Sequence, residues 1–160
     1  MQQSLMHLPN MEFLTKDDIV QFNEMTIQEH GGNFVPPCNF LNENSLDYLL
    51  EAVGSELFGQ PMYPSISDKA AFYMFSIVTG HIFQDGNKRT GLEAALLFLK
   101  LNGAILDDAL TQIAAPPDKL IPSVGGDSLE LLENFTIEMA SSQITLDEAR
   151  QWFAANAQTQ

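Results

Sequence analysis

The chain has 160 residues, of which 45% are hydrophobic and 18% charged, the balance of one globular domain. Its 21 acidic residues outnumber its 7 Lys and Arg, and the formal net charge of −14 disfavours direct binding to nucleic acid. A single cysteine, Cys38, excludes an intrachain disulfide and a cysteine-based zinc cluster. No apolar stretch is long enough to cross a membrane, and the first ten residues do not resemble a signal peptide. We therefore expect a soluble, cytoplasmic protein.

Two helices are predicted in the first third of the chain. Thr15 begins the first helix, because Asp18 lies three residues later in the spacing of a capping box, and a Gly-Gly pair ends it. A loop rich in Pro and Asn follows over residues 33–44. Ser45 is the predicted cap of the second helix.

A central pair of apolar helices is predicted after residues 54–66, a segment that contains two Gly and two Pro. That segment is too apolar for a plain linker, so it should pack on the core or cover a site. The third helix is predicted to begin at Ser67 and end at Gly80, and the fourth to run from about Asn87 to Asn102. Both are apolar on most faces, so both should be buried by their neighbours.

Two amphipathic helices are predicted near the C-terminus. One begins at about residue 128, and Thr145 begins the other in a capping box with Glu148. No segment alternates polar and apolar residues over the length of a strand. We therefore expect an all-α domain in which a polar loop joins the two buried central helices.

That loop, GHIFQDGNKRTG at residues 80–91, is the candidate site. A helix that begins here carries unpaired N–H groups and a partial positive charge, which together bind phosphate. Gly86 allows the backbone to approach a ligand closely, and Asn87 can cap the helix. Lys88 and Arg89 add positive charge where the helix dipole opposes it, which indicates an anion that offsets this cost.

Three more side chains extend the hypothesis from phosphate binding to phosphate transfer. A carboxylate at Asp85 would repel a bare anion, but it could bind a Mg²⁺ ion that bridges to phosphate. His81 could accept the proton of an incoming hydroxyl, and Phe83 should point into the core. Taken singly, the loop residues also fit a helix C-cap, a tight turn and a solvated helix start. Their joint spacing favours a site.

HIFQDGNKRTG resembles the signature of the Fic/Doc superfamily, H-x-F-x-[DN]-[GA]-N-[GK]-R, and the run up to residue 103 is similar to its Doc-like branch of toxins. HGGN at residues 30–33 also lies where Doc-like chains carry a Gly-Gly pair. The resemblance implies a Fic-type helical domain with, at most, a short β-hairpin flap. Residues 1–106 would form its catalytic core, and the helices of residues 107–160 would pack on that core within the same domain.

The resemblance also implies a role for each residue of the motif. His81 would be the general base that deprotonates a target hydroxyl, Phe83 the buried aromatic, and Asp85 the residue that coordinates Mg²⁺. Four consecutive residues would bind the phosphates of ATP: Gly86, Asn87, Lys88 and Arg89. A flap that aligns the target peptide would lie within residues 57–64 and include three apolar side chains: Phe58, Met62 and Tyr63.

Two positions bear on which part of the nucleotide is transferred. Fic proteins that transfer AMP have Gly where this chain has Lys88, and a second Arg where it has Leu92. In Doc-like proteins these changes accompany transfer of the γ-phosphate to a Ser or Thr, and the implied target is a translation factor such as elongation factor Tu. A separate antitoxin is implied, because the nearest internal inhibitory pattern, SLELLEN at residues 128–134, is one residue too long. AMP transfer at the same site and a non-catalytic binding module are the alternatives.

Overall fold

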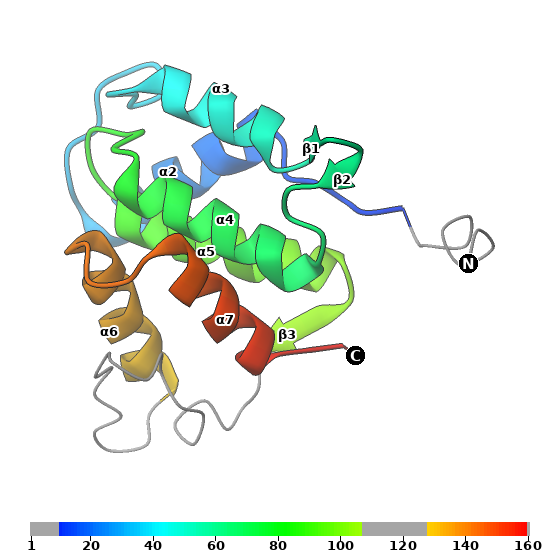
Figure 1. The fold of residues 1–160 in the computed structure, drawn as a ribbon. Coiled ribbons are helices and arrows are strands. Elements are labelled where there is room, and N and C mark those ends of the chain that lie inside the picture. The colour runs from blue at the N-terminus through cyan, green and yellow to red at the C-terminus, as the bar shows by residue number, and fades with distance from the viewer. Residues whose placement is uncertain (1–9, 107–127, 160) are drawn as a thin grey trace.

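The computed structural model describes residues 10–106 and 128–159 (Figure 1). Within those ranges it contains six helices and four short strands, so the expected all-α class with a short hairpin is confirmed. The expectations for the first nine residues, and those for residues 107–127, lie outside the described part of the chain. No helix in the described part is both long and apolar enough to cross a membrane.

Helix α2 (Lys16–His30) begins as predicted, whereas helix α3 (Glu43–Ala52) does not. Thr15 Oγ1 accepts from the backbone N–H of Asp18, and Asp18 Oδ2 accepts from the N–H of Thr15, at 3.1 and 2.8 Å. The prediction that Ser45 caps the second helix is wrong, because Asn42 is the N-cap residue. The backbone N–H of Asn42 donates to Ile82 O at 2.9 Å, so a contact with a distant loop sets where this helix begins.

A two-residue hairpin, β1 (Glu56–Leu57) with β2 (Gln60–Pro61), precedes helix α4 (Ile66–Thr79). The predicted start of this helix at Ser67 is also wrong. Ser65 is the N-cap, because it lies three residues before Asp68, the separation that a capping box requires. Gly80 ends the helix as predicted.

Helices α4 and α5 (Asn87–Leu101) form the predicted buried pair, and Figure 1 shows them side by side at the centre of the molecule. Gly91 allows them to pack closely, since a Cβ atom there would lie 2.6 Å from Val78 Cγ2. The largest fully buried side chains of the pair come from both helices: Tyr73, Met74, Ile77, Phe98 and Leu99. Burying each of them stabilises the fold by about 1.5–3 kcal/mol. The rigid pair fixes both ends of the loop that joins it.

Helices α6 (Ser128–Ala140) and α7 (Leu146–Asn156) pack against this pair, α6 on both helices and α7 mainly on α4. The predicted capping box at the start of α7 is present. Two strands that the sequence did not predict close the fold, because β3 (Ala104–Leu106) pairs antiparallel with β4 (Ala157–Thr159). Each is only three residues long, too short for an alternating pattern to be recognised.

Candidate active site

The motif loop lies at the end of the α4–α5 pair, beside the loop that joins α2 to α3 (Figure 1). Phe83 is fully buried, and its ring stacks on that of Phe40 with centroids 5.5 Å apart. The backbone N–H of Leu41 donates to Ile82 O at 2.8 Å, so the two loops are also joined through their main chains. Contacts with the loop between α2 and α3 therefore hold the motif in place, in addition to the two helices that it joins.

Gly86, rather than Asn87, is the N-cap of α5 and has φ +80, in the left-handed region that favours glycine. The first helical hydrogen bond runs from Thr90 N to Gly86 O at 3.0 Å. The three N–H groups before it, those of Asn87, Lys88 and Arg89, therefore have no partner within the helix and form the predicted anion-binding end. The side chains of Lys88 and Arg89 are exposed beside them.

The Asn87 side chain folds back on the loop instead of capping the helix. Its Oδ1 accepts from Phe83 N at 3.0 Å, and its Nδ2 donates to Phe83 O at 2.9 Å. Both ends of the amide are thus paired with one residue, which closes the loop into a fixed ring. The Asn87 side chain therefore links the backbone of the buried Phe83 to the start of α5 and fixes the shape of the loop.

The Asp85 carboxylate is held by two backbone N–H groups. Gly86 N donates to its Oδ1 at 2.8 Å, and Asn33 N donates to its Oδ2 at 3.0 Å. The Gly-Gly pair of the sequence allows the second contact, because a Cβ atom on Gly32 would lie 2.8 Å from Asp85 Oδ2. Each oxygen keeps a further lone pair for another partner.

This carboxylate fits a Mg²⁺ ion that arrives with substrate phosphates. Within residues 10–106 and 128–159, no group of three or more His, Cys, Asp or Glu side chains could form a metal site by itself. Mg²⁺ bound to nucleotides typically takes one or two protein carboxylates and completes its shell with phosphate oxygens and water. Asp85, exposed beside the predicted anion-binding end of α5, meets that requirement.

His81 is exposed at the start of the loop, two residues after Thr79, the last residue of α4. Its φ of +50 lies in the left-handed region, which is uncommon for a residue with a side chain. Such conformations persist only where the surrounding structure imposes them, and they cluster at functional sites. The alternative that His81 is the C-cap of α4 is wrong, because Gly80 is that residue. The conformation of His81 therefore supports a functional role.

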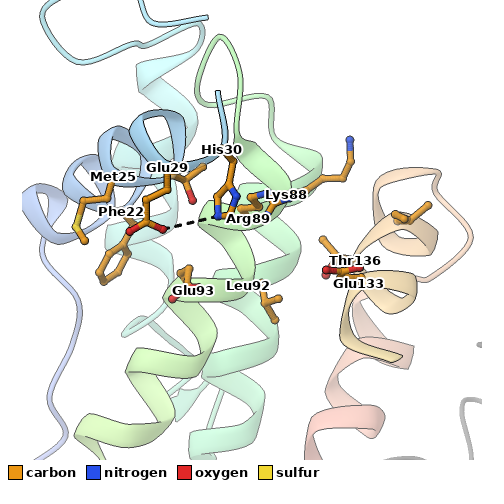
Figure 2. Close-up of a pocket in the computed structure, with 12 residues that line it drawn as sticks. Phe22, Met25, Glu29, His30, Lys88, Arg89, Leu92, Glu93, Glu133 and Thr136 are labelled. Carbon is orange, nitrogen blue, oxygen red and sulfur yellow. Dashed lines mark ion pairs between the residues drawn. The ribbon is translucent and has the colours of Figure 1, made fainter. Parts of the chain in front are cut away.

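A cavity of about 460 Å³ lies beside Lys88 and Arg89, between α2, α5 and α6 (Figure 2). Leu92 of α5 lines it. Figure 2 shows Glu133 and Thr136 of α6 facing α5 across the opening. The other lining residues combine apolar and acidic side chains: Phe22, Met25, Thr26, Glu29, His30, Glu93 and Ile137. No local sequence pattern indicates this cavity, because its walls come from three helices that are distant along the chain.

The three residues proposed as a flap do not lie beside the motif. Their hairpin adjoins the N-terminus of α4, whereas the motif follows its C-terminus (Figure 1), and a helix of 14 residues is about 21 Å long. Tyr63 is buried and stacks on Phe72 at 4.0 Å, Phe58 is 96% exposed, and Met62 is 38% exposed. The segment that contacts the motif is instead residues 33–42.

Three fully buried polar residues beneath the loop were missed by the sequence reasoning: Asn23, Asn39 and Thr90. Asn23 lies four residues after the buried Ile19, so it occupies the core-facing side of α2. A polar residue in such a position requires hydrogen-bond partners. The core-facing position of Asn23 in the sequence pattern could therefore have indicated its structural role. Asn39 and Thr90 carried no comparable signal in the sequence.

Comparison with known proteins identifies the family. The family model described as the Fic/DOC family matches residues 13–99, which include the motif loop and most of α2–α5. "Protein kinase doc" of Escherichia phage P1 is 30% identical over 102 residues, which cover 62% of this chain and 75% of that protein. "Toxin Doc" of Mycolicibacterium smegmatis is 28% identical over 156 residues, which cover 96% of this chain and 97% of that protein. The chain belongs to the Fic/DOC family, and its relatives are Doc-like.

Proposed function

We propose that the protein is a Doc-like toxin that transfers the γ-phosphate of ATP to a Ser or Thr hydroxyl of a target protein. The observation that carries this proposal is the site itself. A cationic, amide-lined helix terminus directly follows a loop that carries an exposed histidine and an exposed carboxylate, His81 and Asp85. The names of the two relatives, a protein kinase and a toxin, support the same activity.

In the proposed reaction, the imidazole of His81 accepts the proton of the target hydroxyl as its oxygen attacks the γ-phosphorus. The bond between that phosphorus and the β–γ bridging oxygen breaks, and ADP leaves with the electron pair. Lys88, Arg89 and the first N–H groups of α5 bind the phosphate oxygens and stabilise their charge. Mg²⁺ held by Asp85 would supply further neutralisation of the phosphates.

The cavity between α2, α5 and α6 would take the nucleoside part of ATP. It opens beside the phosphate-binding residues, and its volume of about 460 Å³ lies within the range of small-molecule pockets. Leu92 supplies an apolar wall there, where a second Arg would instead bind phosphate. A nucleotide whose nucleoside lies against Leu92 would place its terminal phosphate at Lys88 and Arg89, which favours transfer of phosphate over transfer of AMP.

The proposed target is a translation factor, for which elongation factor Tu is the precedent among Doc-like proteins. A separate antitoxin would restrain the activity, and the site of action would be the cytoplasm. The net charge of −14 disfavours direct contact with nucleic acid and does not bear on the choice of protein target.

Mass spectrometry of the intact target tests the proposal. Elongation factor Tu would be incubated with the protein, ATP and Mg²⁺, alongside a His81→Ala variant whose folding is checked by circular dichroism. A gain of one phosphate that requires His81 is expected. A gain of AMP would instead establish the transferase alternative. Growth arrest by both the parent and His81→Ala, without any modification of target, would favour the non-catalytic binding module.

A further inference from the structure

We propose, on the basis of the phosphotransfer function above, that Asn23 and Asn39 are positioning residues that orient Asp85 for its metal ion. Neither residue belongs to the motif. Both side chains are fully buried directly beneath it, Asn23 on α2 and Asn39 in the loop between α2 and α3. They form a relay of two amides that links these elements to the Asp85 backbone.

The hydrogen bonds of the relay have one donor-to-acceptor direction, and a backbone group at each end fixes that direction. Val35 N can only donate, and it donates to Asn39 Oδ1 at 2.7 Å. Asn39 must therefore present its NH₂ group to Asn23, and Asn39 Nδ2 donates to Asn23 Oδ1 at 2.9 Å. Asn23 in turn presents its NH₂ group to the motif.

At the motif end, Asn23 Nδ2 donates to the backbone carbonyl of Asp85 at 2.8 Å and to Thr90 Oγ1 at 3.2 Å. A carbonyl can only accept, so the orientation that Val35 imposes at one end is the one that Asp85 requires at the other. An unpaired polar group at such depth is costly, so reversing either amide is strongly disfavoured.

The relay controls the carboxylate of Asp85 by two routes. It pulls the Asp85 carbonyl inward toward α2, which leaves the side chain on the exposed side of the loop. It also anchors Val35, two residues after Asn33, whose N–H holds Asp85 Oδ2 at 3.0 Å. Partners that orient a metal ligand in this way affect metal affinity strongly although they never touch the ion.

Two variants of Asn39 test the relay. Asn39→Gly removes the amide but keeps the backbone, because the residue has φ +61, which glycine adopts readily. Asn39→Asp keeps the acceptor for Val35 but presents an acceptor to Asn23 Oδ1, so the Asn23 amide must reverse and face the Asp85 carbonyl with its oxygen. Both variants should weaken binding of Mg²⁺–ATP to the purified full-length protein, measured by calorimetry.

The expected loss is about 10-fold or more for Mg²⁺–ATP, against about 2-fold or less for ATP in EDTA, since the perturbation acts through a metal ligand. Asn156→Ala is the matched control. Asn156 is also fully buried, but it lies on α7 and its Nδ2 donates to Trp152 O at 2.8 Å. It should lower the melting temperature without changing the ratio of the two affinities.

The quantity compared is the affinity for Mg²⁺–ATP divided by the affinity for ATP in EDTA. The inference would be overturned if this ratio were the same in the parent and in both Asn39 variants. It would also be overturned if the ratio fell equally in Asn156→Ala. If one Asn39 variant does not fold, the other gives the measurement. If neither Asn39 variant folds while Asn156→Ala does, the relay is purely structural and the inference is overturned. Binding needs no target protein, so the outcome is separable from the proposed function. A parent that transfers AMP, or modifies no target, could still show the metal-specific loss.

Discussion

A methyl group added at Gly86 should damage the site far more than its size suggests. Gly86 has φ +80, and a Cβ atom there would lie 2.9 Å from Asn23 Nδ2 and 3.1 Å from both Ile27 Cδ1 and Thr26 Cγ2. Gly59 has nearly the same dihedral angle, φ +78, but a Cβ atom there would have no other atom within 4 Å. Gly59→Ala is therefore a matched control that carries the conformational penalty alone.

The left-handed conformation costs an alanine about 1–2 kcal/mol, and this should be the whole effect of Gly59→Ala. Gly86→Ala adds overpacking of about 1–3 kcal/mol, for a total of about 2–5 kcal/mol. The upper half of that range is expected, because both Nδ2 hydrogens of Asn23 are engaged in hydrogen bonds and the group cannot withdraw freely. Urea denaturation measures both free energies of unfolding.

In a thermal scan each kcal/mol should lower the melting temperature by about 2–4 °C at this chain length. Gly86→Ala should also lose the proposed phosphate transfer, whereas Gly59→Ala should keep it. Equal destabilisation of the two variants would refute the reasoning, since it would show that α2 does not pack against the Asp85–Gly86 peptide as the structure has it.

Three further predictions concern the supports of the motif and of the central helix. Phe83→Ala should destabilise the fold by about 3–5 kcal/mol by urea denaturation, because it removes a buried ring stacked on Phe40; a loss below 1 kcal/mol would contradict that burial. Burial raises the pKa of Tyr73 to about 12, so stability should fall as the pH rises from about 10 to 12, and Tyr73→Phe should show a flatter fall over that range. Burial alone would raise the pKa of Asp68, but hydrogen bonds from Arg150 and Ser65 outweigh it and hold the pKa below its usual 3.8. The stabilisation from Asp68 is therefore present above that value and lost as the pH falls below it, and urea midpoints of Asp68→Asn should lack this acid-dependent loss.

The sequence predicted the elements whose signals are local. Thr15 with Asp18 and Thr145 with Glu148 have capping-box spacing, and both helices begin where these pairs place them. Ser45 shows the limit of such signals, because a good cap residue was available but the chain had already entered the helix at Glu43. The bond from Asn42 N to Ile82 O decides that start, and no local pattern reports a contact across forty residues.

The same division applies to the site. The motif predicted the loop and a helix that begins near Asn87, because both follow from neighbours in sequence, but Gly86 rather than Asn87 is the N-cap. No local pattern indicates that residues 33–42, rather than the hairpin at Phe58, contact the motif. Buried polar partners such as Asn23 were missed for a related reason, since their role depends on which backbone group they meet.

The residues that hold the motif loop from outside all lie within the part of the chain that the family model matches. Asn23, Asn33, Asn39 and Phe40 all hold the loop through side-chain or backbone atoms, and all lie within the matched residues 13–99. The far wall of the cavity is different, because α6 lies beyond the match and supplies Glu133, Thr136 and Ile137. The supports of the motif loop therefore lie within the residues that the family model covers, whereas one wall of the cavity beside Leu92 comes from a helix outside them.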